Sequence, residues 1–131
     1  MAEGLSVATA NGLLSAIFRG VAYAVADLWA QKHVGPPGAD GDANIAGDTR
    51  RVDASTAYGT SPAGGQISND AAIGPWLDVP VAETYTHLSF WTAESGGTFV
   101  ASGTVTAAAV AVGDDWSAQP GDCTAAFPTA S

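Results

Sequence analysis

The side chains best placed to bind a metal ion lie in one short stretch, GPPGADGDAN, at positions 35–44. Asp40 and Asp42 alternate there with small residues, as at the start of a calcium-binding loop. An EF-hand loop beginning at Asp40 needs glycine at its sixth position and glutamate at its twelfth, where this chain has Ile45 and Arg51. The glycines also repeat every third residue, but this collagen-like period ends after three triplets. The stretch therefore best fits a turn-rich connection between strands, and a calcium site of another geometry stays open.

The two histidines, His33 and His87, are the next candidates for chemistry. Neither has the spacing to cysteine, histidine or carboxylate that marks a zinc site. His87 and Ser89 share a strand face, but a pair two residues apart lacks the third partner of a catalytic triad. Phosphate-binding glycine loops and the G-x-S-x-G elbow are also missing from the sequence. We therefore expect hydrogen-bonded strand histidines, no catalytic residue, no metal and no cofactor; the chain is predicted not to be an enzyme.

Four tryptophans could stack on sugar rings: Trp29, Trp76, Trp91 and Trp116. In a chain this small, tryptophans more often anchor a core or an interface. We favour the core or interface role and keep a carbohydrate-binding domain as an alternative.

Composition and charge narrow the classes of partner. The chain has 131 residues, with 4 Lys+Arg against 13 Asp+Glu and a formal net charge of −9. Nucleic-acid binding needs clustered cations, so we expect no nucleic acid as a partner, and no membrane. The length suits one domain, predicted over residues 1–131, and the single Cys123 cannot form an internal disulfide.

The N-terminal part of the chain is predicted to be a helix over about residues 7–19. Apolar residues recur there at helical spacing, Ser6 is a plausible N-cap, and Gly20 is a plausible stop. Such a face either packs on the rest of the domain or docks on a neighbouring subunit. For the second case the predicted subunit or capsid contact consists of Leu13, Leu14, Ile17 and Phe18.

After Gly20 the period changes from 3.6 to 2, and six to eight short strands are expected over about residues 22–128. The clearest is a hairpin whose arms flank the turn ESGG at 94–97. The predicted fold is therefore mainly β: a small antiparallel β-sandwich or barrel preceded by one N-terminal α-helix. The other expected strands are 28–34, 51–54, 66–68, 76–79 (an edge strand between Pro75 and Pro80) and 105–112.

Several segments in series resemble a family of small virion proteins of actinobacterial tailed phages, whose members are labelled tail fibre, minor tail or head decoration protein. The resembling segments are ATANGLLSAIFRG (8–20), LWAQKHVGPPGADGDANIAGDTRR (28–51), ISNDAAIGPWLDVPVAETYTHLSFWTAESGGTFVASGTVT (67–106) and VAVGDD (110–115). Against the family pattern, Pro36 stands where the turn after His33 usually carries aspartate. Lys32 replaces a usual apolar residue, which suggests that its strand lies at an exposed edge.

The resemblance implies a non-enzymatic structural protein on the surface of the phage particle, made in the host bacterial cytoplasm. The leading hypothesis is a capsid decoration protein on the head exterior, and the alternative is a minor tail or tail-fibre component that contacts the host surface. The expected partners are other virion proteins, either the major capsid protein or tail proteins. A homo-oligomer is also expected, with a trimer as one possibility, because closed symmetric contacts are the usual way to share a surface.

Overall fold

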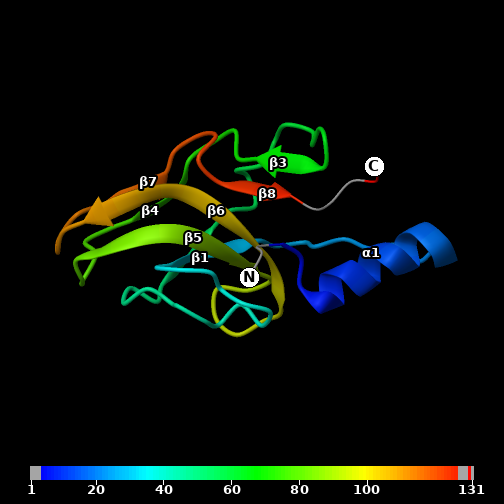
Figure 1. The fold of residues 1–131 in the computed structure, drawn as a ribbon, viewed down its shortest axis with the longest axis horizontal. Coiled ribbons are helices and arrows are strands. Elements are labelled where there is room, and N and C mark those ends of the chain that lie inside the picture. The colour runs from blue at the N-terminus through cyan, green and yellow to red at the C-terminus, as the bar shows by residue number, and fades with distance from the viewer. Residues whose placement is uncertain (1–3, 127–129, 131) are drawn as a thin grey trace.

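The computed structural model describes residues 4–126 and 130. In this part of the chain one helix is followed by eight strands, and the helix projects from one end of a β body (Figure 1). The elements are α1 (Val7–Arg19), β1 (Trp29–His33), β2 (Arg51–Asp53), β3 (Gln66–Ser68), β4 (Ile73–Trp76), β5 (Glu83–Trp91), β6 (Phe99–Val110), β7 (Trp116–Ala118) and β8 (Thr124–Ala126). Residues 127 and 128, the end of the predicted β region, lie outside the described residues.

The strands form two antiparallel sheets. The larger has the order β2-β1-β5-β6-β8-β3, and the smaller pairs β4 with β7. The predicted mainly-β fold with a preceding helix is thus confirmed. The described strands do not close into a barrel, so the barrel alternative is wrong.

The hairpin of β5 and β6 is the centre of the larger sheet. Its turn contains Gly96 and Gly97 at φ 67° and 74°, a conformation that glycine adopts without steric cost. A side chain on Gly97 would also meet the Thr92 Oγ1 atom at 2.8 Å. The ESGG turn was therefore predicted correctly, because it rests on local backbone chemistry.

Two strand predictions need correction. The segments 98–102 and 105–112 were expected as separate strands, but β6 runs without interruption from Phe99 to Val110. Gly103 stays in the strand because β8 crosses close to it, with the Thr124 carbonyl oxygen 2.7 Å from the position of an added Cβ. The strand expected at 76–79 is instead β4, and it contains Pro75 at an irregularity between Ile73 and Trp76.

The alternation of side chains along β5 is also interrupted. Tyr85 and Leu88 are both buried although the sequence pattern puts them on opposite faces. A register shift between Tyr85 and His87 exchanges the two faces at that point. Tyr85 consequently packs on Trp116 of the smaller sheet, while Leu88 lies in the main core.

The core fills the space between the two sheets and beneath the loops. Its largest fully buried members are Trp76, Tyr85, Ile73, Leu88 and Val79. The rings of Trp76 and Trp116 lie 5.4 Å apart, and those of Tyr85 and Trp116 lie 5.1 Å apart. These aromatic contacts hold β4 and β7 against β5.

The segment just before the helix, residues 4–6, pairs with strand β6 of the sheet. Leu5 bridges Ala101, the Ser6 N–H donates to the Val100 carbonyl at 2.8 Å, and the Ser102 N–H donates to the Gly4 carbonyl at 2.7 Å. The Ser6 side chain accepts the Thr9 N–H at 3.1 Å, as an N-cap does. The helix then ends at Gly20 in the left-handed region, so the predicted cap and stop are both correct.

Candidate functional site

A serine and a histidine do meet in this structure, but they are not the pair that the sequence pattern suggested. Ser89 donates its hydroxyl to Nε2 of His33 at 2.6 Å, and His33 donates from Nδ1 to the Ala43 carbonyl at 2.8 Å. Trp91 donates from Nε1 to the Ser89 hydroxyl oxygen at 2.8 Å. The pairing arises because His33 and Ser89 lie on adjacent antiparallel strands, β1 and β5.

The geometry around this pair is structural. His33 and Ser89 are both fully buried, so no substrate reaches the hydroxyl oxygen in this conformation. Burial also lowers the pKa of His33, which keeps the ring neutral and suited to this fixed pattern of donors and acceptors. The prediction of a hydrogen-bonded strand residue is correct for His33. His87 is half-buried and forms a contact with the Thr86 hydroxyl at 2.8 Å.

The second buried polar group is centred on Lys32. Its ammonium donates to Asp48 Oδ2 at 2.6 Å and to the Tyr85 hydroxyl at 3.1 Å, and it lies 4.3 Å from the centre of the Tyr85 ring. Lys32 is 0% exposed, in a strand paired on both sides, so the expectation of an exposed edge is wrong. A buried lysine is tolerated here because Asp48 and the Tyr85 ring together compensate its charge.

Asp48 also pairs with a second cation, Arg50. Arg50 donates from Nε to Oδ1 at 2.7 Å and from Nη2 to Oδ2 at 2.8 Å, in the forked geometry typical of a strong pair. Burial opposes ionisation of Asp48, but the hydrogen bonds from Arg50 and Lys32 prevail and hold its pKa at about 2. Burial lowers the pKa of Lys32 in spite of the opposing effect of Asp48. The cluster is thus an ionic group of three side chains, in which the charged Asp48 carboxylate pairs with both Lys32 and Arg50.

The stretch 35–44 forms a loop that returns to the end of β1. The Val34 N–H donates to the Asn44 carbonyl and the Ala43 N–H to the Pro37 carbonyl, each at 2.9 Å. This is the turn-rich connection that the sequence favours. Asp40 and Asp42 are exposed in it, and within residues 4–126 no three histidine, cysteine or acidic side chains are grouped to hold a metal.

The tryptophans divide between core and rim. Trp76 is buried and donates from Nε1 to the Arg50 carbonyl at 2.9 Å, as predicted for a core anchor. Trp91 is half-buried, and the Arg51 guanidinium lies 4.2 Å from the centre of its ring. That face of the Trp91 ring is therefore occupied by a cation.

The feature that projects from the β body is the arm, defined here as residues 4–28: the root 4–6, helix α1 and the segment 20–28 that returns to β1 (Figure 1). On the helix, Phe18 is 79% exposed, Ile17 71% and Leu14 52%, while Leu13 is half-buried. The return segment lies along the helix, where the Tyr23 hydroxyl donates to Thr9 Oγ1 at 3.3 Å. Three of the four predicted contact residues thus form an exposed apolar surface. This surface, called the stripe below, consists of Leu14, Ile17 and Phe18.

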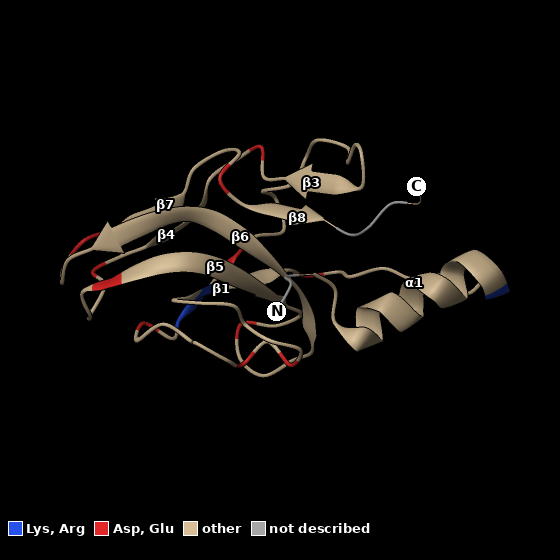
Figure 2. Cartoon of the chain, viewed as in Figure 1, with Lys and Arg blue, Asp and Glu red and all other residues tan. Residues whose placement is uncertain are grey.

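Charge distinguishes the arm from the rest of the molecule. The arm has only two charged residues, Arg19 at the far end of the helix and Asp27 at the base, although the whole chain carries 13 acidic residues. Figure 2 shows the acidic residues on the β body and at the base of the arm. The arm is therefore the region that another acidic protein can approach with least repulsion.

Sequence reasoning found the helical stripe and missed the apolar return segment beside the helix. Val21 and Tyr23 are also exposed there, at 47% and 37%, and the Tyr23 ring packs on the side of the helix that carries Thr9 and Gly12. The run VAYAVA at 21–26 carries the signal, since it is apolar, free of charge and follows a helix stop.

Within the described residues no helix is long and apolar enough to cross a membrane.

Comparison with known families gives one match over nearly the whole chain. The family described as Podophage GP4 fiber I protein gp80 matches residues 4–126. Comparison with curated proteins gives no match. The chain belongs to this phage fibre family and is a structural protein of the phage particle, so the expected virion class is confirmed.

Proposed function

We propose that this protein is a non-enzymatic component of a phage fibre and that the arm is the surface by which it joins the assembly. The observation that carries the proposal is the exposed apolar stripe of α1, with Phe18 and Ile17 each more than two-thirds exposed. A β body with its own packed core has no need of these side chains. An isolated helix of 13 residues is marginal in water, which supports a packing partner for this one.

The family description favours a fibre over head decoration, which was the leading hypothesis from sequence. The matched family is named for a fibre protein, and the match includes the arm as well as the β body. In this proposal the partners are other virion proteins, including further copies of the chain. The buried polar groups around His33 and Lys32 hold the sheet in register and take no part in attachment.

The energetic basis of attachment is burial of the stripe. Removing a phenylalanine side chain from a buried contact costs about 3 kcal/mol or more, which corresponds to a loss of affinity of over a hundredfold. Phe18→Ala with Ile17→Ala should therefore abolish incorporation into particles. The β body should stay folded, because neither side chain contributes to its core.

The test is to produce particles while the host supplies either wild-type protein or the double variant, and to quantify the protein in purified particles with an antibody. Val112→Ala is the matched control, since Val112 is 67% exposed on the β body and not on the arm. Normal incorporation of the double variant would disprove the arm as the attachment surface. Antibody-labelled gold on the head, at hundreds of copies, would overturn the fibre assignment in favour of decoration.

A further inference from the structure

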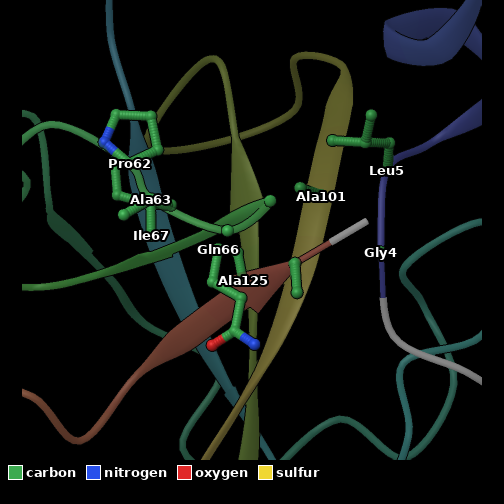
Figure 3. A pocket seen from close by; sticks show the side chains of 11 residues that line it. Gly4, Leu5, Pro62, Ala63, Gln66, Ile67, Ala101 and Ala125 are labelled. Carbon is green, nitrogen blue, oxygen red and sulfur yellow. The ribbon is translucent and has the colours of Figure 1, made fainter. Parts of the chain in front are cut away.

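An apolar groove lies beside the root of the arm (Figure 3). It has a volume of about 360 Å³ and is bounded by the arm root, the turn before β3, and strands β6 and β8. None of its lining residues is charged, and Gln66 is the single one with a polar side chain. The residues used below are Leu5, Ala63, Ile67, Ala101 and Ala125.

The groove continues into a second apolar hollow of about 250 Å³. The two share Leu5, Ile67, Ala101 and Ala125, so one continuous apolar surface extends from the molecule's edge toward Phe90 and Val100 of the core. An apolar cavity of about 150 Å³ accepts a benzene ring. The groove is therefore large enough for a phenyl ring together with an aliphatic neighbour.

The stripe on the chain's own helix lies too far away to fill this groove. Gly4 and Leu5 line the groove, and the helix begins directly after the root, at Val7. With a rise of about 1.5 Å per residue, Phe18 lies roughly 16 Å along the axis from Val7. Figure 1 shows the helix pointing away from the sheet at this point. Stripe and groove of one copy are thus spatially separate, and none of residues 4–126 covers either of them.

Charge favours an arm-to-body contact over an arm-to-arm contact. The arm, residues 4–28, carries Arg19 and Asp27 and is neutral overall, while the chain as a whole carries −9, so the remainder carries −9. Two arms laid together bring two arginines of the same sign into one contact. An arm laid on a neighbour's body brings Arg19 toward a surface of opposite sign.

We propose that the helix of one copy packs its stripe, led by Ile17 and Phe18, into the groove of a second copy. The contact is heterologous: each copy offers an arm to one neighbour and a groove to another, so a ring forms if the rotation closes. The inference rests on the proposed role of the arm as an attachment surface. It adds what the arm attaches to.

The test uses two variants of the purified full chain, each of which blocks one side of the contact. The arm variant is Ile17→Ala with Phe18→Ala. The groove variant is Ala125→Glu, which puts a carboxylate on the apolar lining. Mass is measured by size-exclusion chromatography with light scattering, circular dichroism checks folding, and Val112→Ala is the control on the body.

We expect wild type and Val112→Ala to form oligomers and each blocked variant to be monomeric. Mixing the two blocked variants should give a one-to-one complex, because the groove of the first and the arm of the second are intact. An arm-to-arm contact predicts instead that the groove variant assembles alone and that mixing adds nothing. Either of those two results would overturn the proposal.

If Ala125→Glu does not fold, a second groove variant takes its place. Ala63→Glu puts the same charge on an exposed position of the groove rim, outside any strand. Phe127→Ala tests the chain's own C-terminal segment as the occupant. If wild type stays monomeric and only this variant forms oligomers, the segment fills the groove and the proposal fails for the intact chain.

Failure of this inference can be separated from failure of the proposed function. If purified wild type is monomeric at all concentrations while the arm variant still fails to enter particles, the arm binds a different virion protein. The copy-to-copy contact is then wrong and the attachment role stands. If the arm variant enters particles normally, the attachment role itself is wrong.

Discussion

The β body and the arm distribute their side chains in opposite ways. The body buries a lysine, a histidine and an aspartate, with Lys32 and His33 at 0% exposure and Asp48 at 2%. The arm exposes a phenylalanine and an isoleucine, Phe18 and Ile17, at 79% and 71%. Each is the reverse of what the residue type ordinarily does in a protein of this size.

The difference shows which region is complete by itself. Every buried charge of the body that is described above has a partner within the chain: Lys32 has Asp48 and Tyr85, and Asp48 has Arg50 as well. The apolar stripe of the arm has no such partner among residues 4–126. The body is therefore complete by itself, whereas the arm, in our proposal, is one half of a contact with another molecule.

The largest effect is expected when the buried ion pair is broken. Asp48→Ala leaves the Lys32 ammonium buried without its carboxylate, which should lower the free energy of unfolding by about 3–5 kcal/mol. Urea unfolding at pH 7 measures the change, with Asp42→Ala, an exposed position, as the control. The loss should shrink at pH 10, because burial already lowers the pKa of Lys32 and the amine then sheds its proton in the folded state. A loss under 1 kcal/mol at pH 7 would show that the pair does not hold the body together.

The second-largest effect is expected at low pH, which should lower the free energy of unfolding of the β body. The pKa of Asp48 is held at about 2 in the folded state and returns to about 4 on unfolding, so the stability it contributes is complete above pH 5. That contribution, about 2 kcal/mol, should be lost as the pH falls from 5 toward 2. Burial lowers the pKa of His33, which adds a loss of the same sign just below pH 6.5. Urea midpoints measured across this range check it, and Asp48→Asn should flatten the lower part of the curve.

Removing the helix cap should have a smaller effect, and it should be confined to the arm. Ser6→Ala deletes the side-chain acceptor for the Thr9 N–H and should cost the helix about 1 kcal/mol. Hydrogen exchange of the amides in residues 9–19 should accelerate while the amides of β5 keep their protection. Ser6→Asp retains an acceptor and serves as the control. Equal acceleration in β5 would mean that arm and body unfold as one unit.

The smallest effect on stability is expected from the stripe itself. Ile17→Ala with Phe18→Ala should change the free energy of unfolding of dilute monomer by less than about 0.5 kcal/mol, because exposed side chains contribute little. Urea unfolding at a concentration below assembly measures it, with Leu88→Ala as a core comparison that should cost about 2–5 kcal/mol. A loss of similar size in both variants would place the stripe in the body's own core and remove the contrast.

Local chemistry made much of the fold predictable. The helix bounds follow from the Ser6 cap and the Gly20 stop, and the β5–β6 hairpin follows from the ESGG turn. The shift of register after Tyr85 was not predictable, because it depends on Trp116, which is distant in sequence and packs on the Tyr85 ring. The continuity of β6 through Gly103 was missed for the same reason, since β8 approaches there.

The candidate site, like the fold, was predictable from the sequence only in part. The helical period identifies the stripe at 13–18, but no local pattern says whether a stripe faces its own domain or a neighbour. The pairing of His33 with Ser89 and of Lys32 with Asp48 depends on which strands and loops become adjacent in space. The groove is made by four separate segments, so nothing in any one of them indicates it.

The way the arm is fastened has a mechanical consequence. Its N-terminal root is bonded to β6 through Gly4 and Ser6, and its other end continues directly into β1. These two strands lie on either side of β5 in the same sheet. A pull on the tip of the helix is therefore divided between two strands of the sheet. If the arm is the attachment surface, as we propose, a force on it would reach the body at two separate strands.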